Sequence, residues 1–436
     1  MAQQLIGQDP RDVDACFEGI RRSYIFRGGM AGLGISALTG LEIALWDLAG
    51  KAQGVPVYRL LGGKFRDRVR LYVDSAMTNC QERAEEARSK GFTAIKFDLD
   101  DAGNPHKADA WNWSVTPGEL EIMVDLAEAL LERIEFADWA VFAKNGSDLT
   151  TWAIRVARES TKRPLIVKAK GAYHGVDAWC DPGLGGRIPE DRSSVLEFEW
   201  NDLEALSSLF SRNEGRIAAV ILTPYHHAAF APSELPAPGF WKGVEDLCRR
   251  HGSLLVLDDV RCGGRLSEGG SHRYFGFVPD LSVYSKALGN GYAISACVGR
   301  EDFRKPSMDV FLTGSCWNDA LAMTAALKSL ELSGRGKVAD AVLEKGNRLC
   351  TGLEQAASQA GQSLRMTGPA SMPYPSFEDD ESLFKIQKFC RLCAEEGIYF
   401  HPHHNWFLGN AHDDESINRA IGVAEKAMDR MSDEVS

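Results

Sequence analysis

The sequence predicts an α/β protein with a mostly parallel β-sheet. Three continuous apolar runs of strand length lead to this prediction: PLIVKAK at 164–170, RIAAVILTP at 216–224 and GSLLVLDDV at 252–260. Strands that are apolar without interruption are typical of parallel sheets with helices on both faces, and helix-like patterns separate these three. Each run ends near polar residues, so we expect a ligand crevice at the carboxyl ends of the strands.

Length and charge narrow the class of protein. At 436 residues the chain is longer than one hydrophobic core usually serves, so we expect two or more structural units. Its 44% hydrophobic and 25% charged residues are ordinary for a globular enzyme. The formal net charge of −12, without a cluster of Lys and Arg, argues against nucleic acid as a partner.

No targeting or membrane segment is expected. The amino terminus, MAQQLIGQDPRDVD, has no basic stretch followed by an apolar core. The most apolar long segment, 32–50, is interrupted by Glu42, Asp47 and several glycines, which argues against a membrane span. We therefore expect a cytoplasmic protein that does not bind membranes.

The first third of the chain alternates between strand and helix patterns. Thr39 and Glu42 predict a capping box at the start of a helix that ends before Gly54. A strand is expected in VRLYVDS, a helix in QERAEEARSKG, a second strand in TAIKFDLD, and a further helix in TPGELEIMVDLAEALLERI that begins at Pro117. This alternation predicts parallel βα units.

Residues 40–72 (GLEIALWDLAGKAQGVPVYRLLGGKFRDRVRLY) and 91–100 (GFTAIKFDLD) resemble the mandelate racemase branch of the enolase superfamily, most of all its sugar-acid dehydratases. The resemblance implies a partial helical cap and an incomplete β/α barrel over residues 1–131. That family holds Mg²⁺ with carboxylates on three later barrel strands, and the pattern changes between Ala129 and Ala140, before those strands. Lys96 and Asp98 would lie on the base-carrying strand, where we favour a structural role.

The stretch around Lys286 indicates a different chemistry. Asn145-Gly146-Ser147 forms a polar turn before a helix pattern, which suits a phosphate or is an ordinary helix cap. Asp258 ends one apolar strand, and Lys286 follows the next. Pyridoxal 5'-phosphate needs a lysine, a carboxylate for its pyridine nitrogen, an aromatic contact and a helix amino terminus for its phosphate.

Several motifs resemble the class III pyridoxal-phosphate aminotransferases, near glutamate-1-semialdehyde aminomutase. They are, in order, VFAKNGSDLTTWAIRVAR, KGAYHG, LLVLDDVRCGGR, FGFVPDLSVYSKALGNGYAISACVGR and GSCWNDALAMTAAL. The resemblance runs from about residue 136 to the end. It implies a fold-type I large domain over 132–330 with a mixed, mostly parallel sheet, a small α+β domain over 331–436, and a homodimer.

The resemblance also implies roles for individual residues. Lys286 would be the aldimine lysine and proton carrier, and Asp258 would pair with the pyridine nitrogen. Val260 would pack under the cofactor ring, and Tyr173 would stack on its other face.

The remaining roles implied by the resemblance concern the phosphate. Gly146 and Ser147 would bind it through backbone N–H and hydroxyl groups. Ser315 stands where the family usually has a phosphate-binding threonine that comes from the neighbouring subunit.

A pair of cysteines and a group of histidines are not interpreted as metal sites. Cys390 and Cys393 form a CxxC pair, which we interpret as reduced core thiols on one helix face. The histidine-rich stretch YFHPHHNWFLGNAH at 399–412 is expected to form a strand of the small domain, because adjacent histidines would point to opposite sides of a strand.

We therefore predict an aminotransferase or aminomutase that moves an amino group between a small amine or amino acid and a keto or aldehyde compound. Two alternatives stay open at this point. The chain is a catalytically impaired chimera whose parts cannot complete their cores, or it is an Mg²⁺-dependent dehydratase or racemase of the enolase type.

Overall fold

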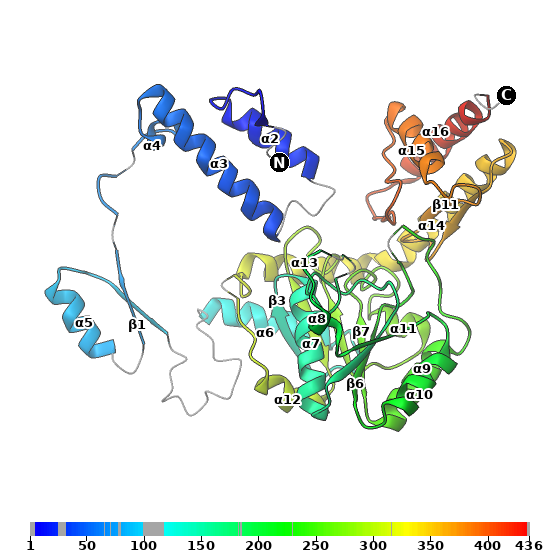
Figure 1. Ribbon diagram of the computed structural model, residues 1–436, viewed down its shortest axis with the longest axis horizontal. Coiled ribbons are helices and arrows are strands. Elements are labelled where there is room, and N and C mark those ends of the chain that lie inside the picture. The colour runs from blue at the N-terminus through cyan, green and yellow to red at the C-terminus, as the bar shows by residue number, and fades with distance from the viewer. Residues whose placement is uncertain are drawn as a thin grey trace. The chain divides into compact units, whose positions relative to one another are not determined.

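The computed structural model describes residues 5–24, 32–64, 66–69, 71–76, 80–98, 117–181, 183, 185–228, 230–314 and 316–433. The contacts between Cα atoms divide the chain into two compact units, Met1–Asp98 and Leu99–Ser436 (Figure 1). Within the described residues, no helix is long and apolar enough to cross a membrane.

The first unit is mostly helical. Its elements are α2 (Val13–Tyr24), α3 (Gly32–Gln53), α4 (Val57–Leu60), β1 (Val73–Ala76), α5 (Cys80–Ser89) and β2 (Ile95–Asp98). Strands β1 and β2 are parallel neighbours with α5 between them in sequence, as predicted for a βα unit. In the described part of this unit, the buried apolar cluster is small and consists of Val13, Cys16, Leu45 and Ala49.

Helix α3 begins earlier than the sequence analysis predicts. It starts at Gly32, so Thr39 lies inside the helix and the predicted capping box at Thr39 and Glu42 is wrong. No proline interrupts the residues before Thr39, and Leu38 is buried, so the helix continues through this position. Its end at Gln53 agrees with the predicted stop at Gly54.

The second unit contains a seven-stranded sheet with the order β3-β9-β8-β7-β6-β4-β5. The strands are β3 (Trp139–Ala143), β4 (Leu165–Ala169), β5 (Val195–Phe198), β6 (Ile217–Leu222), β7 (Leu254–Asp258), β8 (Leu281–Tyr284) and β9 (Ser295–Gly299). Strand β9 is antiparallel to both of its neighbours, and the pairings from β8 to β5 are parallel. The structure thus confirms the predicted mixed, mostly parallel sheet.

Helices cover this sheet on both faces. They are α6 (Pro117–Leu131), α7 (Gly146–Thr161), α8 (Pro189–Arg192), α9 (Leu203–Arg212), α10 (Phe240–His251), α11 (Ser271–Phe275), α12 (Arg304–Asp309) and α13 (Ala320–Gly336), with a 3₁₀ turn η3 (Glu301–Phe303). Side chains alternate between the faces of a strand. In β7, Val256 packs in the cluster with α7, whereas Leu255 and Leu257 pack in the cluster with α9 and α10.

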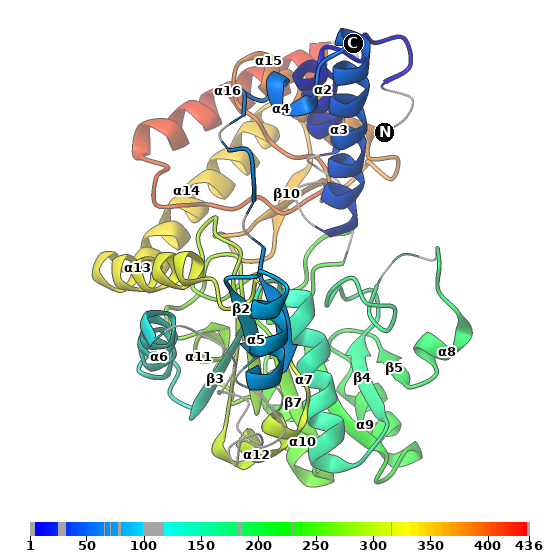
Figure 2. The ribbon, with the colours of Figure 1, turned by 90° about the vertical axis from the view of Figure 1, so that its left-hand side faces the viewer.

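Helix α6 packs with the large sheet. Its Leu126 and Leu130 share a buried cluster with Tyr284 of β8, with Ile294 and with residues of β3, β9 and α13. Helix α6 lies beside α13 (Figures 1 and 2). The sequence analysis places the boundary between the two sequence families after residue 131, and that boundary stays a prediction. Helix α6 packs within the second structural unit, which begins at Leu99.

The carboxyl-terminal part has a core of its own. It consists of α14 (Val338–Gln359), β10 (Leu364–Thr367), β11 (Tyr374–Phe377), α15 (Phe384–Glu395) and α16 (Asp414–Asp433), with β10 and β11 antiparallel. Helix α16 packs along α14 (Figure 2). Cys390 and Cys393 are free thiols buried in this core, as predicted.

The histidine-rich stretch forms a loop between α15 and α16, so the expected strand there is wrong. Its local contacts explain the irregular backbone: the Trp406 indole N–H donates to the His401 carbonyl at 2.8 Å, and the His404 ring contacts the Asn405 carbonyl at 2.8 Å. Across the described ranges, no group of His, Cys, Asp and Glu has a metal-binding arrangement.

Candidate active site

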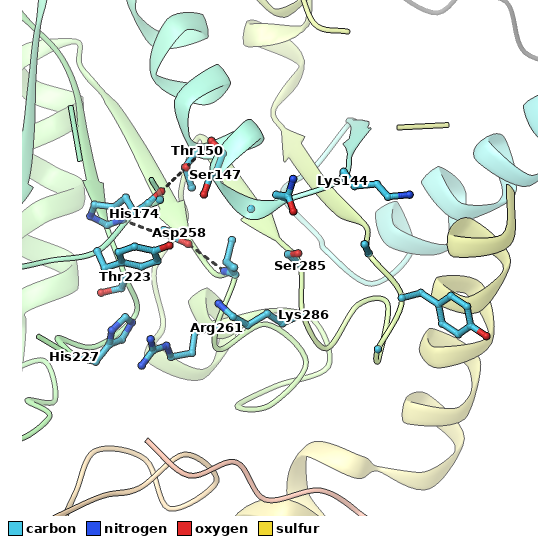
Figure 3. A pocket seen from close by; sticks show the side chains of 18 residues that line it. Lys144, Ser147, Thr150, His174, Thr223, His227, Asp258, Arg261, Ser285 and Lys286 are labelled. Carbon is cyan, nitrogen blue, oxygen red and sulfur yellow. Dashed lines mark hydrogen bonds and ion pairs between the residues drawn. The ribbon is translucent and has the colours of Figure 1, made fainter. Parts of the chain in front are cut away.

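A cavity of about 380 Å³ opens at the carboxyl ends of the parallel strands (Figure 3). Lys144 follows β3, Thr223 follows β6, Asp258 ends β7, and Lys286 follows β8. Because β9 is antiparallel, its amino-terminal end lies at the same edge, and Ala293 just before it also lines the cavity. This is the crevice that the polar strand ends predict.

Six of the seven predicted site residues line this one cavity. They are Gly146, Ser147, Tyr173, Asp258, Val260 and Lys286. The seventh, Ser315, lies outside the described residues.

The amino terminus of α7 forms one wall of the cavity. Asn145 is the N-cap residue, and its backbone N–H donates to the Asp148 carboxylate at 2.8 Å. Gly146 is the first helical residue, and a Cβ atom there would lie 2.8 Å from Cγ2 of Val260. The lack of a side chain therefore lets the helix end approach the end of β7, and its free N–H groups are suited to bind an anion.

Asp258 is buried and held on both carboxylate oxygens. Its Oδ2 lies 2.8 Å from Nδ1 of His174, and its Oδ1 accepts the Val260 backbone N–H at 3.2 Å. The His174 ring stacks on Trp179 at an interplanar angle of 7°, and the Thr150 hydroxyl donates to the His174 carbonyl at 2.6 Å. The carboxylate therefore has a fixed position at the edge of the cavity.

The neighbouring acid, Asp259, does not line the cavity. It is fully buried, and it accepts hydrogen bonds from the Ser271 N–H at 2.8 Å and the Ser271 hydroxyl at 2.5 Å. Desolvation raises the pKa of Asp259 to about 7, although the two bonds from Ser271 act in the opposite direction. Asp259 thus stabilises the start of the short helix α11.

Lys286 has an unusual backbone and a perturbed amine. Its φ of 47° lies in the left-handed region, which is uncommon for a residue with a side chain and is concentrated at functional sites. The side chain is accessible through the open cavity. Desolvation by the surrounding protein lowers the pKa of the Lys286 amine, the positive charge of Arg261 lowers it further, and Asp258 raises it.

Sequence reasoning missed several residues that line the cavity. His174, which lies in the KGAYHG motif, was given no role, yet it is the direct partner of Asp258. Arg261 and His227 were not singled out, although both follow apolar strands whose ends the sequence places at the crevice. Position after a strand end was the available signal, and it would have included all three.

These residues fit pyridoxal phosphate. A lysine with a lowered pKa and a buried, hydrogen-bonded carboxylate line one cavity. The same cavity includes the amino terminus of α7, where Gly146 lies close to Val260. A second glycine, Gly175, has a φ of 140° and would place a Cβ 2.8 Å from Oγ of Ser147, so this loop also closes tightly on the helix end.

Comparisons with known proteins agree with this geometry. Residues 186–410 match the family model for class-III aminotransferases, and residues 1–62 match the amino-terminal domain of mandelate racemase and muconate lactonizing enzyme. An aminopentol aminotransferase from Sphingopyxis macrogoltabida is 39% identical over 310 residues, which are 71% of this chain and 74% of that protein. A glutamate-1-semialdehyde 2,1-aminomutase from Desulforudis audaxviator is 35% identical over 71% of this chain and 77% of its own length.

Solved structures of transaminases and of a pyridoxal-phosphate protein also match this chain. The pyridoxal-phosphate internal aldimine form of the FumI protein from a Sphingopyxis species is 38% identical, with a TM-score of 0.71 over 72% of this chain and 77% of that one. An omega-transaminase from Sphaerobacter thermophilus, 22% identical with a TM-score of 0.65, shares the fold. The chain belongs to the class-III aminotransferases, the pyridoxal-phosphate enzymes that move amino groups.

Proposed function

We propose that the cavity of this chain binds pyridoxal phosphate and moves an amino group between a small amine or amino acid and a keto or aldehyde compound. The observation that carries the proposal is that Lys286 and Asp258, at the ends of the adjacent strands β8 and β7, line the same cavity. In this proposal the cofactor domain lies within 132–330 and the small domain within 331–436.

The amino terminus of α7 binds the cofactor phosphate. Ser147 contributes its hydroxyl and backbone N–H, and Gly146 contributes a backbone N–H at a point where a side chain would collide with Val260. The positive end of the helix dipole favours the phosphate charge. Ser315 adds a hydroxyl from the neighbouring subunit of a homodimer, and light scattering on the purified protein tests this assembly.

Three further residues hold the ring. Val260 packs against one face and Tyr173 against the other. Asp258 would hold the pyridine nitrogen in its protonated form, because a carboxylate attracts a positive charge more strongly in a buried site than in water. His174 fixes the position of this carboxylate. When bound, pyridoxal phosphate withdraws electrons from the substrate carbon that loses its proton.

Lys286 carries protons. Desolvation lowers the pKa of the Lys286 amine, and this favours the uncharged form, which is the form that attacks a carbonyl carbon or removes a proton. Its left-handed backbone directs the side chain from the end of β8 into the cavity. The amine would then hold the proton that it has removed from the substrate carbon.

The relatives suggest substrates of this kind. Their names refer to aminopentol, 3-aminobutyryl-CoA and glutamate-1-semialdehyde, and the first two names specify an amino group. We propose a small primary amine as the donor class for this chain.

Reconstitution with the cofactor tests the proposal. The purified chain mixed with pyridoxal phosphate and dialysed should keep a visible absorption band, and a primary amine that acts as donor should shift that band to shorter wavelength. Lys286→Ala should lose the band, whereas Lys170→Ala, which removes an exposed lysine outside the cavity, should keep it. A colourless wild-type protein, or an unchanged band in Lys286→Ala, would contradict the proposal.

A further inference from the structure

Part of the cavity carries positive charge that no carboxylate neutralises. The charge is that of Arg261, which lines the cavity near Lys286, and Asp258 is the one carboxylate among the described lining residues. That carboxylate is already bound by His174 at 2.8 Å. Within the ranges that the structure describes, neither Arg261 nor Lys286 has an acidic partner at ion-pair distance.

The guanidinium of Arg261 is held in place by a neutral partner. Its Nη1 donates to Oδ1 of Asn405 at 2.6 Å. Asn405 is buried, and its Nδ2 donates to the Ser233 hydroxyl at 3.2 Å and the Met372 carbonyl at 3.0 Å. Because the partner is an amide, the charge of Arg261 is positioned without being neutralised. Its Nε is buried and has no hydrogen-bond partner among the described atoms.

His227 lies beside this charge with both ring nitrogens unpartnered. Its exposed fraction is 7%, and neither Nδ1 nor Nε2 has a hydrogen-bond partner in the described part of the chain. Burial lowers the pKa of His227 well below its usual value, and the charge of Arg261 lowers it further. The neutral ring therefore offers one N–H donor and one acceptor. A buried polar ring without a partner is costly, and a bound ligand would remove that cost.

We propose that Arg261 and His227 form a subsite that binds a carboxylate group of the substrate. The inference rests on the proposed function, since that function brings the substrate into this cavity. A carboxylate accepts hydrogen bonds from a guanidinium and from an imidazole N–H at the same time. In the view of Figure 3, Arg261 and His227 lie on the other side of Asp258 from Ser147, so this end of the cavity is separate from the proposed phosphate site.

A pair of unreactive probes of equal shape tests the subsite. Isobutyrate carries a carboxylate, and isobutyramide is its uncharged counterpart. Isothermal calorimetry measures the affinity of both for the protein with and without pyridoxal phosphate. The wild type should bind isobutyrate about tenfold more tightly than isobutyramide, as expected for a charge-assisted hydrogen bond.

Variants assign this preference to the two residues. Arg261→Gln should bring the ratio of affinities close to one, Arg261→Lys should keep part of it, and His227→Phe should lower it. Arg365→Gln, which removes an exposed arginine from β10, should leave the ratio unchanged. The melting temperature and circular dichroism of each variant show whether it is folded.

Two results would overturn the subsite. The first is equal affinity of both probes for the wild type, with or without cofactor. The second is an Arg261→Gln variant that binds pyridoxal phosphate more weakly but keeps the wild-type ratio, which would assign Arg261 to the cofactor. A wild type that does not bind the cofactor contradicts the proposed function, and the ratio measured without cofactor still decides the inference.

Discussion

Asp258 and Asp259 are sequence neighbours with opposite surroundings. Successive side chains at the end of a strand point in opposite directions. Asp258 therefore lines the cavity and contacts His174, whereas Asp259 is buried against Ser271. One acid is suited to hold a charge on a ligand, and the other stabilises the protein backbone.

The buried acid predicts a pH dependence of stability. The pKa of Asp259 is raised from 3.8 to about 7 by desolvation. Between pH 3.8 and about pH 7, Asp259 keeps its proton in the folded protein and releases it in the unfolded chain. The stability that the protonated Asp259 contributes is therefore complete at low pH and is lost as the pH rises to about 7. Compared with the wild type, Asp259→Asn should gain about 2 kcal/mol of unfolding free energy between about pH 5 and about pH 8.

Urea unfolding at both pH values measures this difference. Asp302→Asn, which changes an exposed acid, is the matched control and should follow the wild type. A constant difference between Asp259→Asn and the wild type at the two pH values would contradict a raised pKa.

Some residues of the site could be predicted from the sequence, and others could not. Asp258 and Lys286 could be predicted, because each follows an apolar strand and the carboxyl ends of parallel strands meet. The contacts between His174 and Asp258, and between Arg261 and Asn405, join residues 84 and 144 positions apart. No local sequence pattern marks either pair, because only the fold brings the two residues of each pair together.

At the scale of elements, the contact between α7 and β7 shapes the cavity. Gly146 at the start of α7 meets Val260 just after β7. Valine is branched at Cβ and has little rotational freedom, so it cannot move away from an added methyl group. The helix amino terminus is thus held close to the end of the strand.

This contact predicts the effect of Gly146→Ala. The new Cβ would lie 2.8 Å from Cγ2 of Val260, so the helix end must move. Overpacking of this kind costs about 1–3 kcal/mol, and we expect the affinity for pyridoxal phosphate to fall by about tenfold or more. Fluorescence titration of the cofactor-free protein measures the affinity.

Gly185→Ala is the control, because no atom lies within 4 Å of the added Cβ. Wild-type cofactor affinity in Gly146→Ala would show that the helix end does not contribute to binding.

Elements were predicted well where apolar periodicity decides them, and less well where tertiary packing does. The strands β4, β6 and β7 match the three apolar runs. The start of α3 was misjudged because Thr39 and Glu42 resemble a cap, whereas the helix continues through them. The loop at 399–412 was predicted as a strand, but its carbonyls bond to its own side chains.

At the scale of the whole molecule, the hydrophobic clusters are distributed unequally. Among the described residues of the unit Met1–Asp98, the buried hydrophobic cluster has four members. The second unit has large clusters on both faces of its sheet and another among α14, α15 and α16, and all of their described members lie after Pro117. The driving force for folding is therefore concentrated in the second unit.

This distribution predicts that residues 117–436 fold without the first unit. The shortened chain keeps α6 and every residue of the large clusters, so its melting temperature should lie within about 5 °C of the full chain. It should also bind pyridoxal phosphate with the same affinity. A chain starting at residue 132, which lacks α6, should be less stable because Leu126 and Leu130 leave the cluster around Tyr284. An insoluble 117–436 chain would contradict this account.

Reduction with borohydride followed by peptide mapping identifies the lysine that binds the cofactor. The protein is mixed with pyridoxal phosphate, reduced, digested and analysed by mass spectrometry. We predict one stoichiometric pyridoxyl modification, on the peptide that contains Lys286, and its absence when Lys286 is replaced by Ala. Modification of another lysine in place of Lys286, or none at all, would show that Lys286 does not bind the cofactor.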